Sequence, residues 1–189
     1  MKVIQLHQEE KQLIKLAVEN NRQAQQQIYA KFSSKMLSVC RQYIKDIHHA
    51  EDVMITGFMK VFTNLKNFEH KGSFEGWIRR IMVYECIDFL RVKKNNFNHQ
   101  DIDDVTVSEN ESVYEMEDFS VDDIQNMIDN LPDGYKMVFN LYAIEGYKHQ
   151  EIAEMLKISE GTSKSQLSHA RKLLQQQITD LKNKLNGTK

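Results

Sequence analysis

The apolar residues along the chain recur mostly at intervals of three and four, the spacing of one face of an α-helix. In the first part of the chain, this spacing predicts three successive helices. The first stripe contains Leu13, Leu16 and Ala17, the second Ile28, Phe32, Met36, Val39, Cys40 and Tyr43, and the third Val53, Phe58, Val61, Phe62 and Leu65. A polar break at residues 46–49 separates the second helix from the third.

A loop and a central helix are predicted next. Residues 66–73 lose the helical spacing and include Gly72, which predicts the loop. The sequence from Phe74 onward is apolar around most of a helix circumference, which is typical of a helix at the centre of a bundle. Arg91, Lys93 and Lys94 supply the basic charges that suit a helix C-terminus.

The remaining chain predicts a linker followed by short helices. Residues 95–120 are polar and weakly periodic, so we expect a linker that is flexible when free. Helical spacing resumes at Val121, Pro132 with Asp133-Gly134 predicts a turn, and Glu145-Gly146 predicts a helix stop. Two closely spaced helices follow, at about residues 149–156 and 160–184.

Composition supports an all-α fold. The chain has one proline and seven glycines in 189 residues, whereas average usage would give about 9 and 13. A β-sandwich or barrel needs more turns than these residues provide. No apolar run approaches the length of a membrane span and residues 1–10 lack an apolar signal core, so we expect no membrane insertion and a cytoplasmic location. Cys40 and Cys86 are isolated, and we expect both to be buried as small apolar residues.

The net charge of −2 conceals a strongly uneven distribution. Residues 95–123 contain ten carboxylates and no Lys or Arg. Residues 1–94 carry 16 basic and 10 acidic side chains, and residues 124–189 carry 9 and 7. Two net-positive ends around an acidic middle predict an anionic partner for the ends.

Residues 148–174 have the pattern of a helix-turn-helix. Ile152 and Leu156 would form the inner face of its first helix, and Ser159 would cap the second helix. The inner face of the second helix would contain Leu167, Ala170 and Leu174, and its outer faces Lys164, Ser165, Ser168, His169 and Lys172. Such a helix can enter a DNA major groove, although a structural helical hairpin with a basic face gives the same pattern.

Two segments together resemble the extracytoplasmic function (ECF) group of RNA polymerase sigma factors, in the sigma-70 family. EIAEMLKISEGTSKSQLSHAR resembles region 4 of the group, whose usual pattern is EIAeiLgiseGTVkSrLhRAR. Upstream, residues 50–91 resemble region 2, with Phe58, Phe62, Phe74, Trp77 and Asp88 in the expected positions. The resemblance covers roughly residues 8–94 and 121–180. It implies two small helical domains, region 2 at residues 1–94 and region 4 at 121–189, joined by the acidic linker at 95–120.

The resemblance implies a transcription initiation factor that directs core RNA polymerase to specific promoters. Region 4 would read the −35 element as duplex, and region 2 would capture the melted −10 strand. The implied −35 contacts are Lys164, Ser165, Ser168 and His169, with Arg171 holding a phosphate or bracing the helix. The implied −10 contacts are Asn67, Phe68, His70, Lys71, Arg79 and Arg80, whereas Phe74 and Trp77 are expected in the core.

The resemblance also implies partner proteins. Asp52, Ile55, Thr56 and Met59 would dock on the β′ clamp helices of the polymerase, and region 4 would dock on the β flap. The sequence departs from the group at several positions. On the docking face, Ile55-Thr56 replace a usual Gln-Glu pair. In region 4, Ser163 replaces a usual Val, Gln166 a frequent Arg, Ser168-His169 a frequent bulky residue and Arg, and Lys148 a Ser that often caps the first helix. Many relatives are held inactive by an anti-sigma factor, which makes one a candidate partner. The acidic linker would either thread the positively charged polymerase channel or serve only as a solvated tether.

Enzymes and metal proteins are poorly matched by the sequence. It contains no GxxxxGK[ST], HExxH or GxSxG motif, so we expect no catalytic residues, cofactor or metal site. His48 and His49 are adjacent in a polar stretch, and we expect both at the surface. Two other functions stay open, a stand-alone helix-turn-helix regulator of duplex operators and a helical protein-interaction module.

Overall fold

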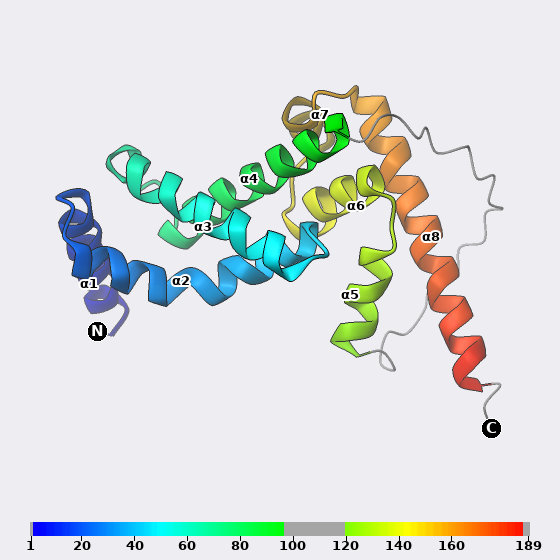
Figure 1. Cartoon of the computed structure of the whole chain (residues 1–189), viewed down its shortest axis with the longest axis horizontal. Helices are drawn as coiled ribbons and strands as arrows, with labels where there is room; N and C mark the ends of the chain where they lie inside the picture. The colour runs from blue at the N-terminus through cyan, green and yellow to red at the C-terminus, as the bar shows by residue number, and fades with distance from the viewer. Residues whose placement is uncertain (1, 97–119, 187–189) are drawn as a thin grey trace. The chain divides into compact units, whose positions relative to one another are not determined.

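The computed structural model describes residues 2–96 and 120–186, and within these ranges the regular structure is helical with no strand (Figure 1). This confirms the all-α prediction. The helices are α1 (Lys2–Val18), α2 (Arg22–Tyr43), α3 (Ile47–Asn64), η1 (Leu65–Asn67), α4 (Phe74–Asn96), α5 (Val121–Asp129), α6 (Asp133–Phe139), η2 (Asn140–Ile144), α7 (His149–Leu156) and α8 (Glu160–Asn186). Residues 97–119, most of the predicted acidic linker, lie outside the described ranges.

The chain falls into two compact units, Met1–Lys93 and Lys94–Lys189. In the first unit, α2 packs against α1 and α3. The centre of α4 is buried, as its all-round apolar sequence predicts, with Ile78, Met82, Val83 and Cys86 fully enclosed. Cys40 is also buried, and both cysteines are free thiols. The prediction that they act as small apolar core residues is therefore confirmed.

The start of α3 corrects the sequence prediction. Residues 46–49 were expected to form a polar break, but only Asp46 lies outside the helix. Its carboxylate accepts a hydrogen bond from the backbone N–H of His49 (2.9 Å), which caps the helix and lowers the pKa of Asp46. The polar residues therefore form an N-terminal turn, in which His48 and His49 are exposed.

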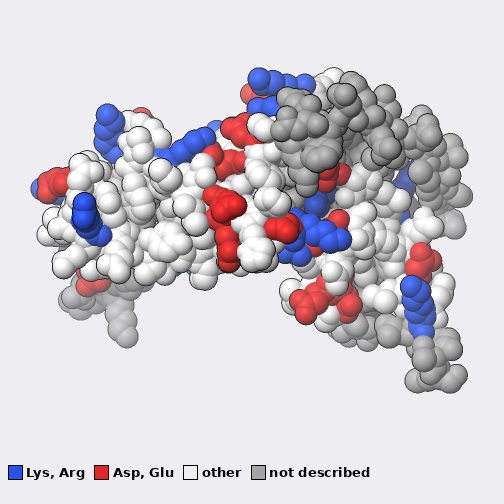
Figure 2. Space-filling view, viewed as in Figure 1, with Lys and Arg blue, Asp and Glu red and all other residues white. Residues whose placement is uncertain are grey.

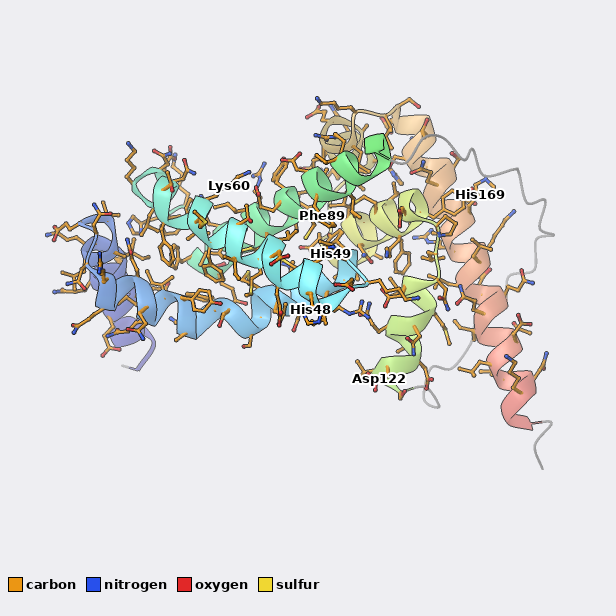
Figure 3. The ribbon with its side chains drawn as sticks, viewed as in Figure 1. His48, His49, Lys60, Phe89, Asp122 and His169 are labelled. Atoms are coloured by element: carbon orange, nitrogen blue, oxygen red, sulfur yellow. The ribbon has the colours of Figure 1, made fainter. Side chains whose placement is uncertain are left out.

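Three contacts join α3 to α4. Gly57 lies so close to α4 that a Cβ at this position would collide with Sδ of Met82. One turn along, Lys60 Nζ lies 2.5 Å from Glu85 Oε1. At the other end of α3, the rings of His49 and Phe89 have centroids 5.5 Å apart (Figure 3).

In the second unit, α6 and α7 pack against α8. Val138, Leu141, Ile152, Leu167 and Ala170 form the buried centre of this small domain. Burial of Ile152, Leu167 and Ala170 confirms three of the predicted inner positions. The prediction that Leu156 lies on the inner face of α7 is wrong. Met155 is the second buried residue of this helix, and Leu156 is half-exposed. Met155 is three residues after Ile152, which is also the spacing of one helical face.

The turns of the second unit follow their residue types. Gly146 has a φ of 78° and ends the helical segment at the predicted position. Between α7 and α8, Lys157 adopts the left-handed conformation, and the Ser159 hydroxyl accepts a hydrogen bond from Thr162 N–H at 2.9 Å. The prediction that Ser159 caps α8 is confirmed.

A capping box at the start of α5 makes part of the stability of the second unit depend on pH. Ser120 Oγ accepts from Asp123 N–H, and the Asp123 carboxylate accepts from Ser120 N–H and its hydroxyl, which lowers the pKa of Asp123 below the usual 3.8. A lowered pKa in the fold means that this stabilisation is present above pH 3.8 and is lost as pH falls through the folded pKa. We expect Asp123→Asn to lower the melting temperature at neutral pH and to match the unchanged protein in strong acid. A constant difference at every pH would contradict this assignment.

Candidate nucleic-acid interface

The predicted duplex-reading side chains lie on the exposed surface of α8. Lys164, Ser165 and Ser168 are exposed near its N-terminal end, and Arg171 continues the same face one turn later. Lys164 Nζ lies 2.7 Å from Glu160 Oε1, and Ser165 Oγ donates to the Thr162 carbonyl at 3.1 Å. The arrangement presents short polar donors and two cations on one helical surface, which is the chemistry needed to contact base edges and phosphates.

Two of the predicted residues on α8 have aromatic neighbours. His169, labelled in Figure 3, is half-buried. Its ring stacks on Tyr135 with centroids 5.5 Å apart and planes inclined by 14°. Arg171 places its guanidinium carbon 5.7 Å from the ring centroid of Tyr142. Both side chains are therefore held against the domain, so they are less free to reach DNA than Ser168.

The structure adds residues that sequence analysis did not propose. Ser163 is completely buried between α7 and α8, and its hydroxyl shares a 2.9 Å hydrogen bond with Nδ1 of His149. The imidazole of His149 is half-buried. It also stacks on the ring of Tyr142, with the two ring centroids 4.6 Å apart. The only sequence signal was the departure from Val at position 163.

Glu160 is a second residue that the sequence analysis missed, although its i,i+4 spacing to Lys164 was readable. Its carboxylate accepts a hydrogen bond from Lys164, which holds the pKa of Glu160 below its usual range. This ion pair removes part of the positive charge that Lys164 can offer to a phosphate. We expect Glu160→Gln to raise duplex affinity by about twofold to threefold at low salt and by less at high salt, measured by fluorescence anisotropy over a salt series. Unchanged affinity at low salt would show that Lys164 faces no phosphate.

The segment between α3 and α4, which begins with η1, contains four of the predicted melted-strand residues, Asn67, Phe68, His70 and Lys71, and its Phe68 belongs to an aromatic cluster. Phe68 is only 8% exposed and packs on Phe74, Trp77 and His70 with ring centroids 4.7–5.5 Å away. Phe74 is buried and Trp77 half-buried, as predicted for core residues. In this structure Phe68 belongs to the same core, so most of its ring is covered by protein.

A pocket of about 280 Å³ opens beside this cluster. Its lining combines the polar side chains of Glu10, Lys11, His70 and Ser73 with the apolar side chains of Ile14, Phe68 and Phe74. Two left-handed residues shape the loop, since His70 has a φ of 56° and Gly72 a φ of 93°. A lining that combines aromatic with polar and charged side chains is suited to an extruded base.

The other predicted melted-strand residues are at the surface. Asn67 and Lys71 are exposed, and Lys71 Nζ pairs with Glu69 at 2.7 Å. On α4, Arg79 is half-buried and Arg80 is exposed, with its guanidinium carbon 5.9 Å from the ring centroid of Tyr84. Asn67, His70 and Lys71 therefore lie within the short segment between α3 and α4, whereas both arginines are on α4.

The predicted polymerase-docking residues share one face of α3. Asp52, Thr56, Ile55 and Met59 are all exposed, Ile55 to 49% and Met59 to 67%. The acidic residues of α3 are Glu51 and Asp52, both in its first two turns, and Figure 2 shows acidic side chains in a band across the middle of the first unit. Two large apolar side chains exposed one turn apart on the same helical face are a candidate contact surface for a partner.

Within residues 2–96 and 120–186, no group of three His, Cys, Asp or Glu side chains is placed to hold a metal ion. No helix in those ranges is both long enough and apolar enough to cross a membrane.

Comparison with known proteins identifies both units. The family profile described as "Sigma-70 region 2" matches residues 28–96, and the profile "Sigma-70, region 4" matches residues 121–174. The chain is 29% identical over 163 residues to the ECF RNA polymerase sigma factor SigW of Bacillus subtilis, covering 79% of this chain and 86% of SigW. It is 23% identical over 184 residues to the ECF RNA polymerase sigma-E factor of Haemophilus influenzae, covering 89% and 95% of the two chains.

Solved structures share the fold. The sigma factor RpoE from Bartonella quintana, solved in complex with the anti-sigma factor NepR, gives a TM-score of 0.54 at 18% identity and covers 82% of this chain and 96% of RpoE. CnrH, solved with the cytosolic domain of CnrY, gives 0.50 at 20% identity and covers 89% and 96% of the two chains. With both regions matched in order by profiles and by full-length relatives, the chain belongs to the sigma-70 family and is a sigma factor of the ECF group.

Proposed function

We propose that this sigma factor binds core RNA polymerase and directs it to its promoters, with the first unit taking the melted −10 strand and the second unit the −35 duplex. The observation that carries the proposal is the presence of both regions in one chain, each on its own compact unit. A stand-alone regulator of duplex operators needs only the second unit, because reading a duplex requires no pocket for an extruded base.

In the second unit, Lys164, Ser165 and Ser168 are the proposed −35 contacts, and His169 and Arg171 border them. Each good base contact discriminates against a wrong base by about 1–3 kcal/mol, whereas a phosphate contact adds affinity without sequence information. Ser165 and Ser168 are short, so they suit close approach of the helix to the base edges. Lys164 and Arg171 supply the salt-dependent part of the binding.

In the first unit, the pocket beside Phe68 is the proposed site for a flipped base of the −10 element. Asn67, His70 and Lys71 would contact the base or its flanking phosphates, and Arg79 and Arg80 would follow the strand along α4. We assign Phe68 to the pocket floor, because it is buried against Phe74 and Trp77. The docking face on α3 would bind the β′ clamp helices, and the second unit the β flap.

Location and regulation complete the proposal. Because its partner polymerase acts on chromosomal DNA, we place the protein in the cytoplasm. Sigma factors are non-enzymatic transcription factors, and we assign no catalytic role to any residue of this chain. An anti-sigma factor is a proposed partner, supported by the NepR complex of the structurally similar RpoE.

Run-off transcription tests the proposal. Purified core polymerase from the same organism would be incubated with fragmented genomic DNA, with and without the protein, and the transcript starts would be sequenced. We expect a defined set of starts that requires the protein and shares two sequence elements upstream. Starts that are the same without the protein would contradict the proposal.

A further inference from the structure

A buried hydroxyl and an imidazole connect the two helices of the helix-turn-helix. Ser163 lies in the first turn of α8 and is 0% exposed. His149 is the first residue of α7, and its Nδ1 lies 2.9 Å from Ser163 Oγ. A buried hydroxyl destabilises a fold unless it is hydrogen-bonded, so this bond compensates for a polar atom where an apolar residue would otherwise be the simpler choice.

Aromatic stacking extends this contact to a third element. The ring of Tyr142, in η2, stacks on His149 with centroids 4.6 Å apart and planes inclined by 23°. The guanidinium of Arg171, two turns beyond Ser163 on α8, lies 5.7 Å from the same tyrosine ring. His149 therefore contacts both η2, through Tyr142, and the start of α8, through Ser163. Tyr142 also contacts the middle of α8, through Arg171.

The position of Ser163 connects this contact to DNA reading. Ser163 points inward, and the next two residues, Lys164 and Ser165, point outward from the same turn. A small rotation of α8 about its axis would therefore displace both outward side chains. Hydrogen bonds to base edges weaken steeply with distance and angle, so even a small displacement changes which bases are accepted.

We infer that His149 and Ser163 are a positioning pair that sets the orientation of α8, and through it the sequence of the −35 duplex that is preferred. The inference rests on the proposed function. It assigns the selectivity of this chain partly to a hydrogen bond inside the domain, in addition to the side chains that face the DNA. Tyr142 supports the pair by stacking on the imidazole from η2.

The test separates orientation from stability with three variants. Ser163→Val leaves the imidazole without its partner, and His149→Leu leaves the hydroxyl without its partner. The double variant His149→Leu/Ser163→Val replaces both groups by apolar side chains, so no polar atom of the pair stays unpaired. We expect each single variant to have a lowered melting temperature and the double variant to recover most of that loss.

Sequence preference is the decisive measurement. Holoenzyme made with each protein would select from promoter fragments in which only the −35 block is randomised, upstream of a start mapped with the unchanged protein. Preference is the ratio of affinities for the sequence selected by the unchanged protein and for a scrambled block. We expect this ratio to fall about fivefold or more in all three variants, including the double variant with recovered stability, while affinity for the scrambled block changes less than about twofold.

A matched control removes a hydroxyl elsewhere on the same helix. Thr179 Oγ1 donates to the Gln175 carbonyl at 3.0 Å, and Thr179→Val should leave the ratio unchanged. A double variant that keeps the ratio within about twofold of the unchanged protein would overturn the inference, while initiation by the unchanged holoenzyme would still support the proposed function. Absence of polymerase-dependent initiation by the unchanged protein would instead overturn the proposed function, and the inference with it.

Discussion

The variant Ile55→Glu/Met59→Glu is expected to lose at least about 30-fold in affinity for core RNA polymerase. Both side chains lie on the exposed face of α3, where they are 49% and 67% exposed, so the substitutions should leave the fold of the first unit intact. Removal of an apolar anchor at the centre of an interface costs about 2 kcal/mol or more of binding free energy. A loss of that size lowers the affinity about 30-fold. The substitutions would also place two charged groups in the contact, and the one at position 55 lies one turn from Asp52. Titration of labelled protein with core polymerase measures the loss.

A control variant distinguishes docking from a general effect of added charge. Val121 is 82% exposed at the start of α5, where a carboxylate is favourable for the helix, and Val121→Glu should bind core polymerase as the unchanged protein does. Melting curves of both variants should agree with that of the unchanged protein. Equal affinity of the double variant and the control would show that the polymerase binds elsewhere.

The fold was largely predictable because its helices are amphipathic. The stripe from Ile28 to Tyr43 is buried in α2, and the bounds of α7 agree with the spacing at residues 149–156. The error at α3 has a physical cause. Asp46, His48 and His49 are polar residues that a break and a capped first turn use equally well, and only the hydrogen bond from Asp46 distinguishes the two.

The candidate site was less predictable, because its contacts join residues distant in the sequence. Position 163 could be read as unusual, but its partner His149 is 14 residues away and on another helix. The role of Phe68 likewise depended on burial, which became visible only through its contacts with Phe74 and Trp77. Exposed residues such as Lys164 and Ser168 followed from helical spacing alone, and their contacts with DNA stay predictions.

The second large expected effect concerns the close approach of α3 and α4. Gly57→Val should destabilise the first unit by about 1–3 kcal/mol, because its Cβ would collide with the fully buried side chain of Met82. In a domain of this size, that loss lowers the melting temperature by about 4–8 °C per kcal/mol. Glycine is a poor helix former, so valine in open space would instead be neutral or slightly stabilising. Gly161 of α8 supplies this control, since the nearest atom to a Cβ there is Ser159 Oγ at 3.6 Å.

Met82→Ala decides whether the collision is the cause. Alone, this substitution leaves a cavity in the core and should cost about 2–5 kcal/mol. Combined with Gly57→Val, the new methyl groups would occupy part of that cavity, so the double variant should be more stable than the sum of the single effects by about 0.5–3 kcal/mol. Additive losses, measured by urea unfolding of all three variants, would mean that Gly57 is needed for another reason. A favourable coupling would show that Gly57 allows the close approach of α3 and α4. Because α3 carries the docking face, polymerase affinity should then fall in Gly57→Val and partly return in the double variant.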